Sequence, residues 1–180
     1  MQIKEINSDI SSKLKRIKML ELLSPEEIEE IAKVIEIVEY NSNEVIVAEG
    51  EISSYLYAVL DGSVRVTVKQ TDEEGVIKDV YICTIGKSET FGEAAVFMNV
   101  ERTADVFAND PVITMRIDRE NLIRFIKSHP GAGIKILMII IFSLLNKLKE
   151  ANRELAFERK TVLAQNDIDA LISDLMGTGS

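Results

Sequence analysis

Three residues near the middle of the chain are of types that can together bind an anion. Gly92 and Glu93 are adjacent, and Arg102 follows Glu93 by nine residues. A guanidinium donates two parallel hydrogen bonds to an anion, and a glycine lets the backbone approach a ligand closely. A carboxylate repels an anion but accepts hydrogen bonds from hydroxyl groups. The three residues predict a site for a ligand with both an anionic group and a hydroxyl.

The sequence around these residues predicts how they are positioned. Residues 93–97 favour a single helical turn, whose first N–H groups are available to a phosphate. Arg102 lies at the start of an expected strand, so its side chain can point into a barrel. A buried guanidinium then needs an anionic ligand or an ordinary salt bridge, for example to Glu93 or Glu101. A phosphate and a sugar hydroxyl together indicate a nucleotide with a compact phosphate.

The composition is that of a soluble globular domain and excludes several functions. The 180 residues are 46% hydrophobic and 28% charged. His129 is the single histidine, which excludes a metal centre built from several histidines. Asp and Glu number 30 against 21 Lys and Arg, a balance that argues against a nucleic-acid surface.

Two further features predict a reduced, cytoplasmic setting. Cys83 is the single cysteine, so there is no disulfide framework, and its apolar neighbours predict a place in the core. No basic-then-apolar signal segment begins the chain, and the longest purely apolar run, residues 136–142, is too short to cross a bilayer. We expect no membrane partner.

Hydrophobic periodicity divides the chain into four regions. Residues 1–40 predict helices, one of which begins at Ser24-Pro25. Residues 41–130 predict a β-barrel that contains the anion site, with a tight turn at Asp61-Gly62. Residues 131–159 predict one long helix, and residues 160–180 a separate tail. The expected strands are 45–48, 55–60, 64–68, 76–85, 103–108 and 112–118, and residues 119–127 form a short helix.

This pattern predicts a mainly β fold with flanking helices (α+β). The architecture we expect is a jelly-roll β-barrel with N-terminal helices, a short helix at the anion site and a long C-terminal helix.

The long helix has two apolar faces. One is a heptad-like seam and the other lies beside it. The seam consists of Leu137, Ile141, Leu144, Leu148, Ala151 and Leu155, and the other face of Ile134, Met138, Ile139, Phe142 and Leu145. Each apolar face is expected to be covered by packing, so we expect one face to pack on the barrel and the other on a second subunit of a homodimer. The alternative is that the seam packs on the barrel.

The residues Phe91-Gly92-Glu93-Ala94-Ala95 and Arg102-Thr103-Ala104 resemble a known motif. They are similar to the phosphate-binding cassette of cyclic-nucleotide-binding domains. These domains occur in the regulatory subunit of cAMP-dependent protein kinase, in the catabolite activator protein and in nucleotide-gated channels. The resemblance covers residues 12–158 and implies a ligand such as cAMP or cGMP.

The resemblance implies a role for each residue of the site. Glu93 would accept a hydrogen bond from the ribose 2′-hydroxyl, and Arg102 would pair with the cyclic phosphate. The phosphate shell would be completed by N–H groups near Gly92 and Ala94 and by the hydroxyl of Thr103, which in relatives can also contact guanine. Lys147 stands where adenine is held, with Ser143 and Asn146 as weaker candidates. The expected ligand-binding residues are Phe91, Gly92, Glu93, Ala94, Arg102, Thr103, Ala104 and Lys147.

The chain departs from the family's pattern at two positions. Asp105 and Phe107 stand where many relatives have a small residue and an arginine. Strand alternation places Asp105 and Arg102 on opposite faces, so the extra carboxylate is expected to leave the phosphate site intact. Many relatives that lose binding have lost the glutamate or the arginine, and both are kept here.

The tail resembles a second known segment. Residues 162–172 are similar to the N-terminal peptide of the flagellar motor switch protein that docks on a phosphorylated response regulator. Ile168, Leu171, Ile172 and Leu175 would form one apolar face of a short helix. We expect a response regulator or another protein as partner of residues 162–175. The alternatives are a tail that folds back on its own domain and a chance match.

These observations predict a cyclic-nucleotide-binding regulatory module of signal transduction, without a DNA-binding domain, that acts through a protein partner. We expect no enzymatic activity and no metal, because neither a ligand set nor a catalytic pair is visible. The alternative is a structural or protein-interaction module with a degenerate pocket, and an enzyme built on the same barrel ranks third. The identity of the nucleotide, cAMP, cGMP or a dinucleotide, stays open.

Overall fold

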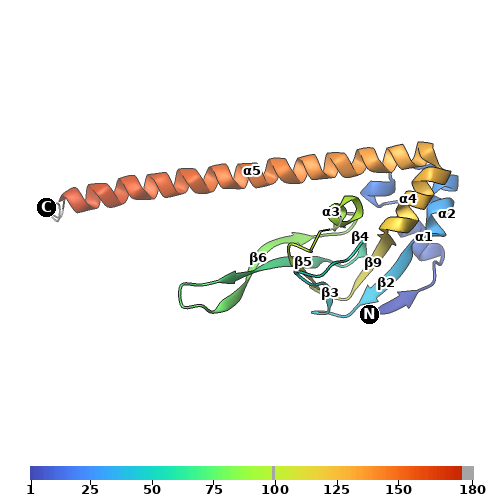
Figure 1. Cartoon of the computed structure of the whole chain (residues 1–180), viewed down its shortest axis with the longest axis horizontal. Helices are drawn as coiled ribbons and strands as arrows, with labels where there is room; N and C mark the ends of the chain where they lie inside the picture. Colours follow the sequence, from blue (N-terminus) through green and yellow to red (C-terminus); the bar gives the residue numbers. More distant parts are fainter. Residues whose placement is uncertain (99, 176–180) are drawn as a thin grey trace. The chain divides into compact units, whose positions relative to one another are not determined.

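The computed structural model describes residues 1–98 and 100–175, with side chains up to Phe157 apart from Ser8. Figure 1 labels most of the helices and strands along the chain. Backbone contacts divide the chain into a first unit, Met1–Ile140, and a second unit, Ile141–Ser180. The elements are β1 (Gln2–Lys4), α1 (Ser8–Leu14), the 3-10 helix η1 (Lys18–Leu20), α2 (Pro25–Ala32), β2 (Glu36–Tyr40), β3 (Val45–Val47), β4 (Tyr55–Asp61), β5 (Val64–Thr71), β6 (Ile77–Ile85), β7 (Thr90–Phe91), α3 (Glu93–Phe97), β8 (Asp105–Ala108), β9 (Val112–Asp118), α4 (Arg119–Ser128) and α5 (Pro130–Leu175).

Two antiparallel sheets form the body of the first unit. One has the strand order β1-β2-β9-β4-β7 and the other the order β3-β8-β5-β6. Buried side chains from both sheets form one core cluster, which includes Val38, Tyr57, Val64 and Val106. The expected mainly β fold with flanking helices is therefore confirmed.

The helices of the first unit pack around a second core cluster. It joins Leu14 of α1, Ile31 of α2, Ile117 of β9, Leu122 of α4 and Ile136 of α5. The start of α2 follows its sequence signal. Ser24 accepts a hydrogen bond from the N–H of Glu27, the Glu27 carboxylate accepts one from the N–H of Ser24, and Pro25 begins the helix.

Three sequence expectations are wrong. Residues 2–4 and 36–40 form strands β1 and β2 rather than helix, because Ile37, Val38 and Tyr40 favour a pleated, half-buried surface. Cys83 is exposed rather than in the core. The reason is that β6 is an edge strand paired with β5, and most of its side chains are exposed.

The long helix also differs from its expected limits. It was expected over residues 131–159, but α5 continues to Leu175. No glycine or proline occurs between Gly133 and Gly177, so nothing in the backbone breaks the helix near residue 159. The side chains of residues 162–175, which were expected to form the docking face of the tail, lie outside the described residues.

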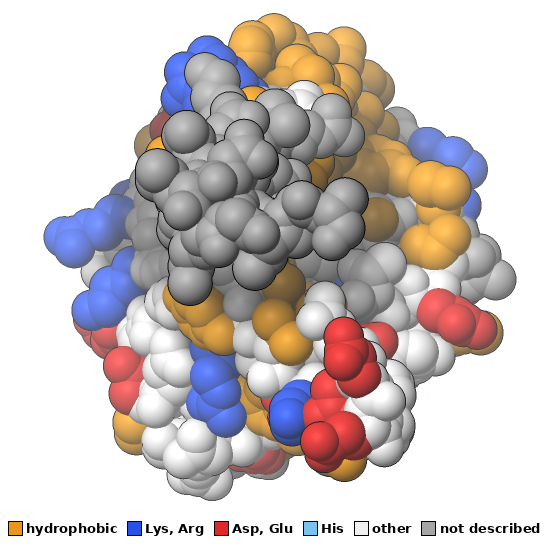
Figure 2. All heavy atoms as spheres, turned by 90° about the vertical axis from the view of Figure 1, so that its left-hand side faces the viewer, with side chains coloured by type: hydrophobic (Ala, Val, Ile, Leu, Met, Phe, Trp, Pro, Cys, Tyr) orange, Lys and Arg blue, Asp and Glu red, His pale blue; other side chains and the backbone are white. Residues whose placement is uncertain are grey.

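The apolar residues of α5 divide in a way that the heptad pattern does not show. Within the first unit, Ala132, Ile136 and Ile140 are buried, and they belong to neither of the two expected faces. Within the second unit, the large apolar side chains Ile141, Phe142, Leu145 and Leu148 are exposed. Exposed hydrophobic side chains of the described residues gather in the upper part of Figure 2. By length and composition alone, the Pro130–Phe157 part of α5 is apolar enough to span a membrane, a property that core helices share.

Candidate ligand-binding site

Gly92 shapes the backbone of the candidate site. It lies between β7 and α3 and adopts φ +80° and ψ 18°, a left-handed conformation that side-chain-bearing residues rarely adopt. A Cβ atom added to Gly92 would lie 2.7 Å from Nη1 of Arg102 and 3.0 Å from the carbonyl oxygen of Tyr55. Glycine is therefore needed here both for its conformation and for the close approach of Arg102.

Glu93 begins α3 and is buried, with 5% of its surface exposed. The hydroxyl of Thr90 donates a hydrogen bond of 2.9 Å to Oε1 of Glu93. Thr90 belongs to β7, which pairs with β4, so the contact ties the carboxylate to the sheet. A carboxylate held in this way can accept a further hydrogen bond from a ligand hydroxyl without moving.

Arg102 is 8% exposed and makes its hydrogen bonds to neutral oxygens. Nη2 donates to the carbonyl oxygen of Tyr55 at 2.7 Å and to the hydroxyl of Ser53 at 3.1 Å. Nη1 donates to the carbonyl oxygen of Gly92 at 3.4 Å. The guanidinium lies over the ring of Tyr57, which in turn stacks on Phe91. Arg102 thus lies where the cassette, strand β4 and the loop before β4 meet.

The charge of Arg102 has no close anionic partner in the described part of the chain. There, no carboxylate oxygen lies within ion-pair distance, so the expected alternative of a salt bridge to Glu93 or Glu101 is not found. Among the described residues, the buried Nε of Arg102 has no hydrogen-bond partner. Burial lowers the pKa of the guanidinium, which is the sign of a cation that lacks full compensation.

The neighbours of Arg102 lie differently from the sequence expectation. Arg102 precedes strand β8 instead of starting it, since β8 begins at Asp105. Thr103 is exposed and Ala104 is half-buried, so both are accessible beside the site. The carboxylate of Asp105 accepts a hydrogen bond from the N–H of Glu49 and pairs with Lys69. Asp105 is therefore engaged away from the guanidinium.

The other expected site residues divide between the two units. Phe91 is buried and Ala94 is exposed, and both flank the Gly92-Glu93 pair in the first unit. Lys147 is exposed on α5 in the second unit, and its contact with a base stays a prediction. Sequence reasoning missed Ser53 and the carbonyl of Tyr55, because no motif marks a loop residue that reaches Arg102 from about fifty positions earlier.

The structure combines a two-sheet β domain with a loop and short helix that bring Gly92, Glu93 and Arg102 into one region. The family model of the cyclic nucleotide-binding domain matches residues 37–129, just over half of the chain. The chain belongs to the cyclic nucleotide-binding domain family, and the predicted family is confirmed.

Solved structures agree on the fold. A cyclic nucleotide-binding domain from Methylobacillus flagellatus is 20% identical, with a TM-score of 0.70 over 81% of this chain and 80% of that one. The catabolite activator protein of Thermus thermophilus is 24% identical, with a TM-score of 0.66 over 78% and 62%. The regulatory subunit of a cAMP-independent protein kinase A from Trypanosoma cruzi, bound to guanosine, is 25% identical, with a TM-score of 0.55 over 64% and 40%. The similarity of the tail to a motor switch peptide stays a prediction.

Proposed function

We propose that this protein is a regulatory module that binds cAMP or cGMP at the Gly92–Arg102 cassette. The observation that carries the proposal is the state of Arg102. Within the part of the chain that the structure describes, it is a buried cation whose Nε has no partner and whose hydrogen-bond acceptors are neutral oxygens. An uncompensated buried charge is costly, and an anionic ligand would offset that cost. The cassette lies within the residues that match the family.

The two polar groups of the cassette suit two parts of one ligand. The cyclic phosphate would pair with Arg102 and with N–H groups at the start of α3, near Gly92 and Ala94. The ribose 2′-hydroxyl would donate to Glu93, whose position Thr90 fixes. Thr103 and Ala104 would border the phosphate. Phe91 stacks on Tyr57, the ring over which the Arg102 guanidinium lies.

Calorimetric titration with cAMP, cGMP and guanosine tests the proposal. We expect at least one cyclic nucleotide to bind and guanosine to bind at least about tenfold more weakly, because it lacks the phosphate. If guanosine bound as tightly as cGMP, the result would contradict the proposed pairing of Arg102 with the cyclic phosphate. No heat and no rise in melting temperature with either cyclic nucleotide at millimolar concentration would contradict the proposal.

A second candidate function is an interaction module whose pocket no longer binds a cyclic nucleotide. The similarity to the Trypanosoma cruzi regulatory subunit, which belongs to a cAMP-independent protein kinase A and is bound to guanosine, favours it. The same titration decides between the two candidates, since this module would bind neither cyclic nucleotide.

We further propose a homodimer formed through α5. The exposed apolar side chains Ile141, Leu144 and Leu148 lie in the heptad-like seam, and a second copy would cover them. A Leu144→Glu, Leu148→Glu double variant should be a soluble monomer with a folded first unit, as checked by light scattering and circular dichroism. A monomeric unmodified protein, or complete unfolding of the variant, would overturn this arrangement.

The output of the module is proposed to be a protein contact. The excess of acidic residues does not suit nucleic acid, and we propose a cytoplasmic regulator without enzymatic activity or a membrane partner. Residues 162–175 would dock on a receiver domain of a response regulator. Direct titration of a phosphorylated receiver domain with the full chain and with a chain stopped at Lys160 tests this role. Binding that is equal for both chains, or absent from both, would contradict it.

A further inference from the structure

Glu51 lies against Arg102 and takes no part in the function proposed above. The N–H of Arg102 donates to the carbonyl oxygen of Glu51 at 2.9 Å, and the N–H of Gly50 donates to the carbonyl oxygen of Arg102 at 2.8 Å. An isolated bridge pairs Ile52 with Glu101 next to these contacts. The loop that carries Glu51 is therefore held in fixed register beside the anion-binding arginine.

The charge of Glu51 acts on the site without cancelling that of Arg102. The Glu51 carboxylate opposes the burial that lowers the pKa of the Arg102 guanidinium, and it adds to the burial that raises the pKa of the Tyr57 phenol. The negative charge of Glu51 therefore acts on both the Arg102 guanidinium and the Tyr57 phenol. Glu51 is half-buried, and among the described residues it makes no ion pair with Arg102.

We propose that Glu51 makes the site select a singly charged phosphate over a doubly charged one. This inference rests on the proposed function. Arg102 contributes one positive charge, while Glu51 and Glu93 each contribute a negative one. A cyclic phosphate diester carries one negative charge and a phosphate monoester carries nearly two at neutral pH. The second negative charge of a monoester has no additional cation to pair with among the Gly92–Arg102 contacts described above, and Glu51 repels it.

Glu101 provides a matched control. It has the same charge and precedes Arg102 directly in the chain. It is exposed, and its carboxylate is not among the groups that act on the pKa of Arg102. Removing its charge changes the net charge of the protein as much as removing that of Glu51, so a difference between the two variants reports the position of the charge.

The test compares the dissociation constants of cAMP and 5′-AMP, or of cGMP and 5′-GMP, by calorimetry at low ionic strength. Glu51→Gln should tighten the cyclic nucleotide about 3- to 5-fold and the monophosphate about 10- to 25-fold, because each ligand charge loses one repulsion. The preference for the cyclic form should therefore shrink about 3- to 5-fold. Glu51→Asp and Glu101→Gln should keep the unmodified preference within about twofold.

Each result decides the inference. An unchanged preference in Glu51→Gln overturns it, and so does a Glu51→Asp variant that behaves like Glu51→Gln, since the residue would then act through loop structure. If the unmodified protein binds no cyclic nucleotide, the proposed function fails. In that case a Glu51→Gln variant that gains binding still supports the role of Glu51, and one that gains none overturns it.

Discussion

Arg102 and Arg116 both lie beside the Tyr55–Tyr57 segment of β4 but have opposite surroundings. Arg116 donates a hydrogen bond from Nε to Oε2 of Glu36 at 2.7 Å, and its Nη2 forms an ion pair with the same oxygen at 2.7 Å. Its guanidinium lies 4.4 Å from the centre of the Tyr55 ring. Burial lowers the pKa of Arg116, but the hydrogen bond and charge of Glu36, together with the nearby Tyr40 and Tyr55, outweigh burial, and the net pKa is raised. Burial lowers the pKa of Arg102, and the more distant charge of Glu51 does not restore it.

The difference separates a structural arginine from one whose surroundings suit the proposed anionic ligand. Glu36 stands directly opposite Arg116 in the pairing of β2 with β9, so the fold itself brings the counter-charge. Arg102 lies outside any strand, and backbone carbonyls and a hydroxyl hold its side chain in place. The fold therefore holds this cation in place without a counter-charge within ion-pair distance among the described residues, as the proposed anionic ligand requires.

The largest expected effect is that of Arg102→Ala on nucleotide affinity. Loss of the charge-assisted contact should weaken binding by about 2–4 kcal/mol, or roughly 30- to 1000-fold. The free energy of unfolding without ligand should change by less than about 1 kcal/mol, because the cost of burying the charge disappears together with its hydrogen bonds. Calorimetry and urea unfolding measure the two quantities.

A conservative control sharpens this first prediction. Arg102→Lys keeps the charge but loses the planar fork, so its affinity should lie between those of the unmodified protein and the alanine variant. Unchanged affinity in Arg102→Ala would contradict the assignment of Arg102 to the ligand.

Arg116→Ala should show the reverse pattern. The free energy of unfolding should fall by about 1–3 kcal/mol, because the variant loses a cross-strand ion pair and a contact with the Tyr55 ring. Nucleotide affinity should change by less than about threefold. Urea unfolding and calorimetry check both values, with Glu36→Gln as a control that should lose only part of the stability. A variant that binds as weakly as Arg102→Ala would erase the distinction between the two arginines.

Much of the fold could be predicted because its signals are local. Hydrophobic patterning and turn signals marked the strands β3, β4, β5, β6, β8 and β9 but not the two-residue strand β7, and the Ser24-Pro25 cap marked the start of α2. Gly62 has φ +80°, as the predicted Asp61-Gly62 turn requires. Cys83 was misplaced because an apolar run looks the same in a core strand and in an edge strand, and only the sheet order separates them.

The candidate site could be predicted in part for the same reason. Gly92, Glu93 and Arg102 lie close together in the sequence and form a recognisable motif. The groups that orient Arg102, namely Ser53 and the carbonyl of Tyr55, come from a distant loop. Their role depends on backbone register, which residue types do not encode. The buried face of α5 was missed because Ala132, Ile136 and Ile140 repeat every four residues and fall outside the heptad seam.

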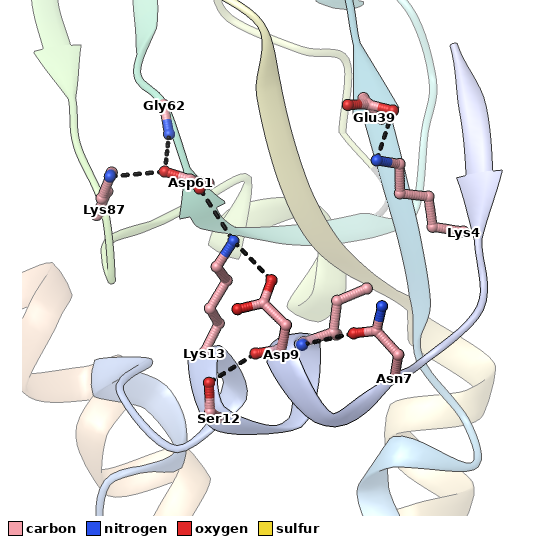
Figure 3. Close-up of polar contacts among 10 residues, drawn as sticks. Lys4, Asn7, Asp9, Ser12, Lys13, Glu39, Asp61, Gly62 and Lys87 are labelled. Atoms are coloured by element: carbon pink, nitrogen blue, oxygen red, sulfur yellow. Dashed lines mark hydrogen bonds and ion pairs between the residues drawn. The ribbon is translucent and has the colours of Figure 1, made fainter.

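Asp61 offers a third kind of charged group, one with partners at the surface. Its carboxylate pairs with Lys13 of α1 at 3.0 Å and with Lys87 at 2.6 Å, and it accepts the N–H of Gly62 (Figure 3). The hydrogen bonds from Lys87 and Lys13 lower the pKa of Asp61 from 3.8 to about 2. Asp61 has close ion-pair partners, as Arg116 does, but its side chain is 37% exposed, so solvent weakens the pairing.

The smallest expected effect follows from this pairing. A carboxylate whose pKa is lower in the folded state stabilises the fold above its unfolded pKa, and the contribution is lost as the pH falls from about 4 through about 2. Solvent screening limits it to about 0.5–1 kcal/mol. Urea unfolding of the unmodified protein and of Asp61→Asn should differ by this amount at pH 7, and the difference should shrink as the pH falls and vanish below about pH 2. Glu73→Gln, a change in the exposed turn after β5, is the control and should show no such difference at any pH. If the stability difference between Asp61→Asn and the unmodified protein persists at the lowest pH, Asp61 acts through its shape rather than its charge.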